Sequence, residues 1–257
     1  MNQLDFIPLS LYPSTPSSSG SVVAEGLTRR FGKFIAVDRL HLTVQPGEIF
    51  GFLGANGAGK TTAIRMFCGL LKPSAGEAWV DGLPVSSAAE LIKKRIGYMS
   101  QRFSLYDDLT IAENVQFFAG LYGVRRREMA LRRTQLFERL GLTERQNRLT
   151  RELPLGYKQR LALGCAIIHQ PRVLFLDEPT GGVDPAARRE FWDLIYELSD
   201  SGVTIFVTTH YMDEAEYCGR ISIMKDGRII ALGAPEQLKA EHGVPNIQAL
   251  FLRLTAA

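Results

Sequence analysis

The stretch from Gly54 to Thr61 reads GANGAGKT and satisfies the pattern G-x-x-x-x-G-K-[ST] at every fixed position. Glycines at these positions let backbone N–H groups surround a phosphate, and the lysine reaches the β- and γ-phosphate oxygens of a nucleotide. The threonine hydroxyl that follows can complete the coordination of Mg²⁺. The residues expected to bind nucleotide here are Gly54, Asn56, Gly57, Ala58, Gly59, Lys60, Thr61 and Thr62. Lys60 is also expected to act in catalysis, and Thr61 as a metal ligand.

A second stretch with chemical potential is VLFLDE, Val173–Glu178, in which four apolar residues precede two carboxylates. A buried parallel strand would deliver Asp177 to its carboxyl end, where the carboxylate can hold Mg²⁺ through water. Glu178, one residue later, can polarise an attacking water as a general base. Two acids at a strand end could instead cap the next helix, but the phosphate loop elsewhere in the chain favours the catalytic interpretation.

A third stretch, LPLGYKQRL at Leu153–Leu161, places proline and glycine just ahead of the apolar run LALGCAII. Proline and glycine where a buried helix begins predict backbone N–H groups that face an anion. The stretch alone does not say which anion.

The elements that must position these residues can be read from the hydrophobic pattern. Strands are expected within 22–44, at 49–53, near 79–80, at 173–176 and 203–208, and as a hairpin within 220–232. Helices are expected at about 60–70, over most of 104–165, at about 186–198, and as a terminal helix at 235–243. Alternation of strands and helices with one helical stretch between them predicts an α/β core that carries an inserted helical subdomain.

The composition is that of an ordinary soluble protein, with 257 residues, 46% hydrophobic residues and a formal net charge of +3. This mild charge does not indicate a nucleic-acid partner. Three widely spaced cysteines, Cys68, Cys165 and Cys218, are expected to be buried and reduced. No apolar stretch is long enough to span a bilayer, and residues 1–20, rich in Pro and Ser, are expected to form a flexible tail.

Together these motifs resemble the nucleotide-binding subunits of ATP-binding-cassette (ABC) transporters, over residues 22 to about 235. DEPTGGVDP at 177–185 resembles the family's Walker B motif and D-loop, with Asp184 as the D-loop aspartate. Gln101 matches the Q-loop glutamine that touches Mg²⁺, and His210 matches the switch histidine that contacts the γ-phosphate. Phe31 stands where the family stacks an aromatic ring on adenine, although an isolated phenylalanine could equally belong to the core. The resemblance implies ATP and Mg²⁺ as cofactors, and Glu178, His210, Gln101 and Lys60 as catalytic residues.

The same resemblance aligns LPLGYKQRL with the family's signature motif, usually Leu-Ser-Gly-Gly-Gln. Gly156 fits, whereas Pro154, Leu155 and Tyr157 replace the usual Ser, Gly and Gln. In the family this loop faces the nucleotide of a second subunit, so Gly156 is expected to act in trans. Loss of the serine hydroxyl removes a hydrogen bond to a charged group, on the order of 1.5–3 kcal/mol if buried. The departure therefore bears on turnover rather than on ATP binding.

The resemblance implies a P-loop NTPase fold with a mainly parallel sheet, an antiparallel β-subdomain and an inserted helical subdomain. The expected organisation is a tail at 1–20, an ABC ATPase domain at 21–240 with helices at about 102–168, and a C-terminal extension at 241–257. The expected partners are integral-membrane permease subunits and a second ATPase subunit, identical or different. The protein is then expected to lie peripherally on the cytoplasmic face of the inner membrane. Residues 106–108, after the Q-loop, are expected to contact the permease.

Single-domain length and the segment QRFSLYDDLTIAENVQFFAGLYG resemble bacterial drug-export ATPases of the daunorubicin-resistance type. An alternative function is a weakly hydrolysing regulatory subunit of a heterodimeric transporter, for which the altered signature would be the reason. A soluble ABC ATPase of translation or DNA repair is disfavoured. The translation family has two cassettes in one chain and the repair family has a long coiled-coil insert, and this sequence shows neither feature. A GTPase is disfavoured because the base-reading motif Asn-Lys-x-Asp is absent from the sequence.

Overall fold

The computed structural model describes residues 19–101 and 104–255, and its first sheet is antiparallel. The sheet has the order β2-β1-β4-β5. Its strands are β1 (Val22–Phe31), β2 (Phe34–Val44), β4 (Ala75–Val80) and β5 (Leu83–Pro84). The predicted turn after Phe31 is the β1–β2 hairpin, in which Phe31 pairs with Phe34.

The second sheet has six strands in the order β10-β9-β3-β8-β7-β6. Its strands are β3 (Ile49–Gly54), β6 (Ile96–Met99), β7 (Val173–Asp177), β8 (Thr204–Thr209), β9 (Arg220–Lys225) and β10 (Arg228–Gly233). Five of them run parallel, and only the edge strand β10 is antiparallel to its neighbour β9. Strands β3, β7 and β8 are buried at every residue because both faces of the sheet are covered.

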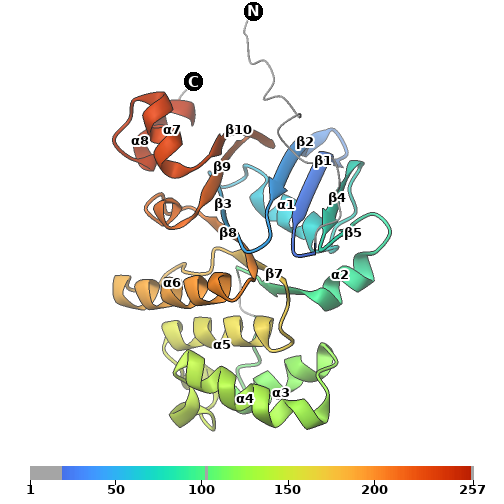
Figure 1. The fold of residues 1–257 in the computed structure, drawn as a ribbon, viewed down its shortest axis with the longest axis vertical. Helices are drawn as coiled ribbons and strands as arrows, with labels where there is room; N and C mark the ends of the chain where they lie inside the picture. Colours follow the sequence, from blue (N-terminus) through green and yellow to red (C-terminus); the bar gives the residue numbers. More distant parts are fainter. Residues whose placement is uncertain (1–18, 102–103, 256–257) are drawn as a thin grey trace, which may run out of the picture.

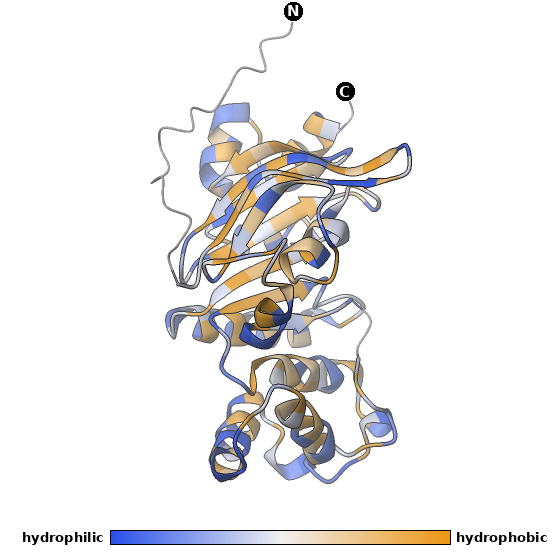
Figure 2. Ribbon diagram, turned by 90° about the vertical axis from the view of Figure 1, so that its right-hand side faces the viewer, coloured by the Kyte–Doolittle hydropathy of each residue, from blue (hydrophilic) through white to orange (hydrophobic). Residues whose placement is uncertain are grey.

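The hydrophobic core lies on both faces of this parallel sheet, whose strands are the most apolar part of the ribbon in Figure 2. On one face, α1 (Lys60–Phe67) and the antiparallel sheet cover a cluster of phenylalanine rings. Phe206 stands at its centre. Its ring centroid lies 5.2–5.6 Å from the ring centroids of four neighbours, Phe50, Phe52, Phe67 and Phe175. On the other face lies α6 (Pro185–Asp200), followed by the helical layer.

The helical layer consists of α3 (Ile111–Leu121), α4 (Arg126–Leu140) and α5 (Leu155–Ile167), at the bottom of Figure 1. Helix α3 begins with a capping box between Thr110 and Glu113, and α4 ends at Gly141, as the sequence predicted, with φ at 64°. These helices lie within the interval 102–168 that the sequence assigned to the inserted subdomain, a boundary that remains a proposal.

Several elements differ from the sequence-based expectation. Helix α2 (Ala89–Arg95) and strand β6 were not predicted. The helix over 235–243 is α7 (Pro235–His242), and it is not terminal, because α8 (Ile247–Thr255) follows it. Helix α1 ends at Phe67, three residues earlier than expected, where Gly69 adopts φ of 67°. The α/β class, the parallel core and the antiparallel subdomain are confirmed.

Several expectations fall near the limits of the described chain. The tail predicted over 1–20 lies outside the described residues except for Ser19 and Gly20, and the amide of Gly20 donates to Asp81 over 2.8 Å.

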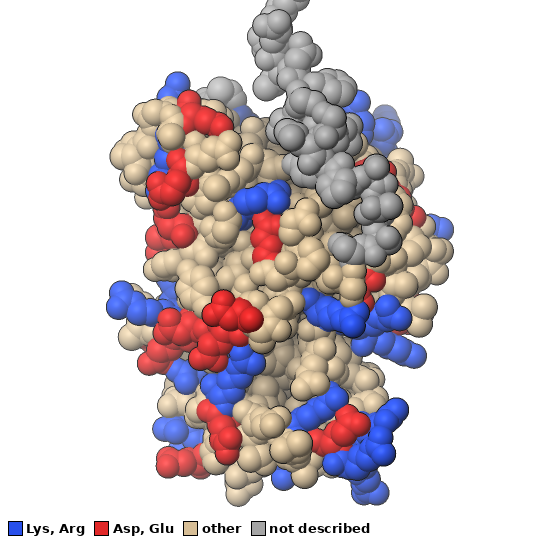
Figure 3. All heavy atoms as spheres, viewed as in Figure 1, with Lys and Arg blue, Asp and Glu red and all other residues tan. Residues whose placement is uncertain are grey.

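The described residues contain no helix that is both long and apolar enough to cross a bilayer. All three cysteines are buried and free. On the face drawn in Figure 3, acidic and basic side chains occur over both the sheet and helical layers rather than in separate fields.

Candidate active site

The predicted chemical residues meet at one edge of the parallel sheet. Strands β3, β8 and β7 are neighbours, and Asp177 at the end of β7 pairs in register with Thr208 near the end of β8. The carboxyl ends of the three strands therefore lie side by side. The loop after Gly54, Glu178 after β7 and His210 after β8 all start from this edge, where α/β proteins place their ligands.

The phosphate loop takes a backbone path that requires glycine. Gly59 has φ of 107°, and a Cβ there would lie 2.3 Å from the carbonyl oxygen of Ala36 in β2. Gly57 has φ of 84° with open space around it. Of the remaining loop residues, Asn56 is exposed, Ala58 is buried, Thr61 is exposed and Thr62 is half-buried. The loop thus leaves its tip open while its end packs closely on the antiparallel sheet.

Lys60 lies within the loop that it is expected to serve. Its Nζ donates to the carbonyl oxygens of Gly54 over 2.7 Å and Ala55 over 3.2 Å, and the residue is only 5% exposed. Burial lowers the pKa of Lys60, an effect that the nearby carboxylates of Glu178 and Asp177 oppose. A cation held in this way faces the space enclosed by the loop with little water around it.

Asp177 and Thr61 supply oxygen atoms suited to a magnesium ion. The Thr61 hydroxyl lies 3.4 Å from Asp177 Oδ1, and the Thr208 hydroxyl donates to the same oxygen over 2.7 Å. Burial raises the pKa of Asp177, while the hydrogen bond from Thr208 acts in the opposite direction. No cluster of three or more His, Cys, Asp or Glu ligands occurs among the described residues. Carboxylate and hydroxyl oxygens are ligands that Mg²⁺ prefers, and the ion is usually held by one or two protein groups together with substrate phosphates.

Glu178 is the point on which the other predicted catalytic residues converge. Gln101 Nε2 donates to Glu178 Oε2 over 2.7 Å, and His210 Nδ1 lies 3.2 Å from that same oxygen. Glu178 has φ of 51°, and its N–H donates to the carbonyl oxygen and hydroxyl of Thr208 over 3.1 and 3.0 Å. The chain therefore turns sharply after β7 and aims the carboxylate at residues that follow β6 and β8.

Phe31 does not belong to the core. It is 47% exposed at the end of β1, and the guanidinium of Arg29 lies 4.6 Å from its ring centre. Phe31 pairs with Phe34 across the hairpin, two residues before Ala36, whose carbonyl oxygen approaches Gly59 of the phosphate loop. Stacking of this ring on adenine stays a prediction.

Gly156 and Asp184 lie together, on a second surface. A Cβ on Gly156 would be 3.2 Å from that of Ala187 in α6. Asp184 caps α6, and its carboxylate accepts from the N–H groups of Ala186 and Ala187 over 3.0 Å each. Within residues 19–101 and 104–255 neither Gly156 nor Asp184 hydrogen-bonds to the phosphate loop. The contacts of both residues are instead with the first turn of α6.

Pro154 stands where the helix α5 begins, as the residue that directly precedes its first turn, with φ of −55° and ψ of 153°. Its carbonyl oxygen accepts from the N–H groups of Tyr157 over 3.0 Å and Lys158 over 3.1 Å. Leu155 then begins the helix, and its side chain lies 3.5 Å from the place a Cβ on Gly182 would occupy.

Sequence reasoning missed Thr208, which ties the metal and base segments together. Its hydroxyl bonds to Asp177 and to the amide of Glu178, and it is fully buried. A signal was present, because a polar residue in the apolar strand TIFVTT must find a partner inside the fold. A second missed group, around Arg188 of α6, is described below.

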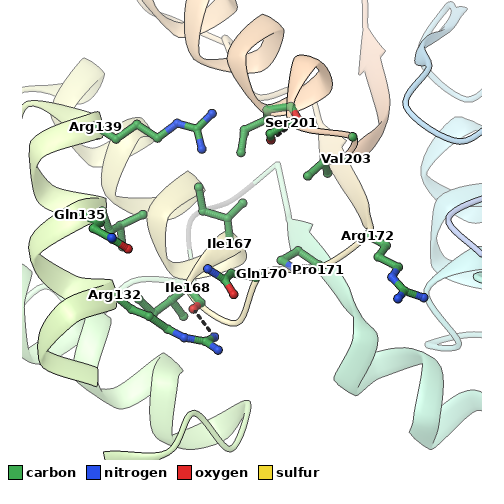
Figure 4. A pocket seen from close by; sticks show the side chains of 13 residues that line it. Arg132, Gln135, Arg139, Ile167, Ile168, Gln170, Pro171, Arg172, Ser201 and Val203 are labelled. Atoms are coloured by element: carbon green, nitrogen blue, oxygen red, sulfur yellow. Dashed lines mark hydrogen bonds between the residues drawn. The ribbon is translucent and has the colours of Figure 1, made fainter. Parts of the chain in front are cut away.

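A cavity of about 430 Å³ lies away from this site, between α4, the end of α5 and the start of β8 (Figure 4). Three arginines line it, and each already has a polar partner. Arg132 donates to the carbonyl oxygen of Ile168, Arg139 to Glu197, and Arg172, whose side chain points away from the cavity in Figure 4, to Ser19. Of these contacts, the one between Arg139 in α4 and Glu197 in α6 ties the helical layer to the core.

The fold and site define a P-loop nucleotide-binding domain, and comparison with known proteins identifies its family. The sequence model of the ABC transporter family matches residues 37–181. The chain belongs to the ABC transporter ATP-binding family. The resemblance drawn from its motifs is confirmed.

Two relatives indicate the kinds of protein that share this sequence. A probable multidrug ABC transporter ATP-binding protein, YbhF of Escherichia coli, is 48% identical over 91% of this chain, which spans only 41% of YbhF. The daunorubicin resistance ATP-binding protein DrrA3 of Streptomyces coeruleorubidus is 38% identical over 90% of this chain and 73% of its own length.

Solved structures share the whole fold. An ATP-binding subunit of an ABC transporter superposes with a TM-score of 0.82 at 26% identity, covering 91% of this chain and 99% of that subunit. The cassette MJ0796, solved as a dimer in a post-hydrolysis state with ADP and Pi, gives a TM-score of 0.74 at 26% identity, covering 83% and 98%. The P-loop NTPase architecture expected from the sequence is therefore confirmed.

Proposed function

We propose that this chain hydrolyses ATP and that hydrolysis drives transport through separate integral-membrane permease subunits. The observation that carries the proposal is the convergence of Gln101 and His210 on the Glu178 carboxylate, at the sheet edge that also holds the phosphate loop. A nucleotide-binding domain without hydrolysis would not need a carboxylate aimed from a strained backbone position at two polar partners.

Nucleotide binding follows from the loop. Its N–H groups and the buried Lys60 ammonium would bind the β- and γ-phosphates, while Thr61 and Gln101, with Asp177 through water, would hold Mg²⁺. The metal ion, when bound, neutralises charge on the phosphates as they separate. Phe31, exposed beside the loop, would stack on adenine.

The hydrolytic step assigns one role to each converging residue. Glu178 accepts a proton from water as the water oxygen attacks the γ-phosphorus, and the bond to the β–γ bridging oxygen breaks to give ADP and phosphate. His210 contacts the γ-phosphate, and its position is set by the same Glu178 oxygen. Gln101 orients the carboxylate from the segment that follows β6.

A second ATPase subunit completes the site. Gly156 and Asp184 lie together at the start of α6, and Gly156 offers a backbone N–H with no side chain in front of it. This arrangement suits two subunits that each present the signature stretch to the other's nucleotide. The motifs fit a dimer with an identical subunit and a dimer with a different one, and the dimeric state of MJ0796 supports dimerisation itself.

The permease would contact exposed apolar residues that follow the Q-loop. Tyr106, Phe117 and Leu121 are exposed, and the rings of Tyr106 and Phe117 meet edge to face with centroids 4.8 Å apart. The contact expected at 106–108 remains part of the proposal, because Asp107 and Asp108 stay largely exposed although they pair with Lys158 over 3.1 Å and Arg151 over 2.7 Å.

The transported molecules would be drugs or other amphipathic compounds, moved outward. The names of YbhF, a probable multidrug transporter protein, and DrrA3, a daunorubicin resistance protein, support drugs as the cargo. The chain would then lie peripherally on the cytoplasmic face of the inner membrane, held there by the permease.

A second candidate is a weakly hydrolysing regulatory subunit within a heterodimer. One observation favours it: Leu155 places an exposed side chain next to Gly182, at the surface where the family's signature has glycine. Such a subunit would bind ATP normally while contributing a poor signature to its partner's site.

Glu178→Gln separates these functions. The variant keeps the shape of the side chain and loses the base, so steady-state phosphate release in the assembled complex should fall about 10²–10⁴-fold. ATP affinity, measured by calorimetry on the same variant, should stay within a few-fold of wild type. If the variant hydrolyses ATP as fast as the wild type, Glu178 is not the base. If neither protein hydrolyses ATP appreciably, the regulatory subunit is favoured.

A further inference from the structure

Arg188, in the first turn of α6, lies between two segments that carry proposed catalytic residues. Its guanidinium carbon is 4.0 Å from the ring centre of Tyr211, and its Nη1 donates to Asp213 over 3.3 Å. Its Nε lies 3.5 Å from Glu214 Oε1. Only 18% of the side chain is exposed, so the guanidinium is held on three sides by the segment after β8.

Glu214 extends this contact to the segment after β7. It is fully buried, and its Oε1 accepts a hydrogen bond from the hydroxyl of Thr180. Thr180 is itself buried and stands two residues after Glu178. One carboxylate oxygen therefore joins Arg188 to the segment that carries the proposed base.

Tyr211 extends the contact in the other direction. Its ring centre is 4.2 Å from that of His210, and its N–H donates to the Thr209 hydroxyl over 2.9 Å. A guanidinium over the face of a tyrosine ring is an attractive arrangement that restricts the ring. Arg188 thus limits the positions of Tyr211 and, through it, of His210.

We propose that Arg188 is a positioning residue that holds the segments 178–180 and 210–214 together, so that Glu178 and His210 face one γ-phosphate. The proposal rests on the proposed hydrolytic function. Arg188 also lies one helical turn after Asp184, on the surface assigned to the second subunit. The same contacts therefore join the dimer surface to His210, and closure of a dimer would act on the histidine through Arg188.

The first test is a double-mutant cycle on ATPase activity in the complex with its permease. Arg188→Met and Tyr211→Ser should each lower kcat about 10-fold, less than the roughly 100-fold loss that a full 1 Å misplacement of reacting groups can cause, with KM for ATP within about 2-fold of wild type. The double variant should lose about 10-fold rather than 100-fold, because both substitutions break one contact. Arg188→Lys, which keeps the charge but not the planar stacking group, should be intermediate. Arg189→Met, at the exposed neighbouring arginine, is the matched control.

The second test does not depend on hydrolysis. Amide hydrogen exchange should be faster in segments 178–181 and 209–214 of Arg188→Met than of Arg189→Met, with α3 and α4 unchanged. Three results would each overturn the positioning role. The first is equal exchange in the two variants, and the second is a double variant whose loss of kcat is the product of the two single losses. The third is a kcat of Arg188→Met within about 2-fold of that of Arg189→Met. If wild-type hydrolysis proves independent of Glu178, the proposed function fails, whereas the exchange result still decides whether Arg188 holds the two segments.

Discussion

At the scale of single residues, Glu178 has a strained backbone conformation at the candidate active site. A non-glycine residue at φ of 51° is in a sparsely populated region that costs on the order of 1–3 kcal/mol. Two hydrogen bonds from its N–H to Thr208 hold it there. Glycine in its place would relieve the backbone and lose the carboxylate, so the strain and the chemistry come from the same residue.

Phe31 gives a prediction at the residue scale. Phe31→Ala should weaken ATP binding by about 1–3 kcal/mol, the usual effect of removing an aromatic ring that stacks on a base. Isothermal titration with Mg·ATP measures this. Phe34→Ala, which removes the more exposed ring across the same hairpin, is the control and should bind as wild type. Equal affinities for all three proteins would mean that Phe31 does not meet the base.

At the scale of elements, His169 joins the helical layer to the sheet. Its ring stacks on Tyr122, just after α3, with centroids 3.8 Å apart, and its Nε2 lies 3.0 Å from the carbonyl oxygen of Ile96 in β6. Burial lowers the pKa of His169 from 6.5 to about 4. The folded protein therefore holds the histidine neutral at a pH where the unfolded chain would already be protonated.

The sign of the resulting pH dependence follows directly. Because the folded-state pKa is below the unfolded value, the neutral histidine costs nothing above pH ~6.5, and stability is lost as pH falls from there to about 4. His169→Gln keeps an N–H donor and cannot be protonated, so its melting temperature should fall less between pH 7 and 4.5 than that of wild type. Over this range the free energy of unfolding of the wild type should fall by up to ~3 kcal/mol more than that of the variant. His41→Gln, at an exposed histidine, should follow wild type, and parallel pH curves for His169→Gln would refute the effect.

The exposed aromatic surface of α3 gives a second prediction at this scale. Phe117→Asp should prevent co-purification with the permease, because it places a charge where an apolar contact is proposed. Leu131→Asp makes the same change at an exposed apolar residue of α4 and should co-purify normally. ATP affinity of both variants checks that they fold. Normal co-purification of Phe117→Asp would move the permease contact elsewhere.

Elements also show what sequence could predict. The phosphate loop, Asp177 and His210 were predictable, because their motifs follow apolar strands whose order along one edge is governed by parallel pairing. Strand β6 was missed, since its four residues include Gly97 and show no alternation. The structure gives the reason for the glycine: a Cβ there would lie 2.5 Å from the carbonyl oxygen of Ala166 in α5. Such close packing between distant segments leaves no local signal, and the contact of Gln101 with Glu178 depends on it.

At the scale of the whole molecule, the chain divides its chemistry between two surfaces. One holds the phosphate loop with Glu178 and His210, and the other holds Gly156 with Asp184 at the junction of α5 and α6. The helical layer carries Gly156 of the second surface, and the contact of Arg139 in α4 with Glu197 in α6, beside the cavity of Figure 4, helps to hold this layer on the core. Rotation of that layer would move Gly156 relative to Glu178, which is how a permease could control a dimer.

The altered signature is best tested at this scale. Pro154→Ser combined with Leu155→Gly restores the common family sequence, and would raise turnover if the departure acts as a brake. The packing of Leu155 against Gly182, and the role of Pro154 as the residue before α5, instead favour a loop fitted to its present sequence. The double variant should therefore leave turnover flat or lower it, since an added glycine loosens the start of the helix by about 1 kcal/mol. Steady-state ATPase of the complex is the measurement, and a several-fold gain would show that the departure is a brake.

Gly156→Asp, which sets a carboxylate against the second subunit's γ-phosphate, should abolish dimer-dependent hydrolysis while ATP binding persists. If that variant turned over normally, this loop would never meet the nucleotide.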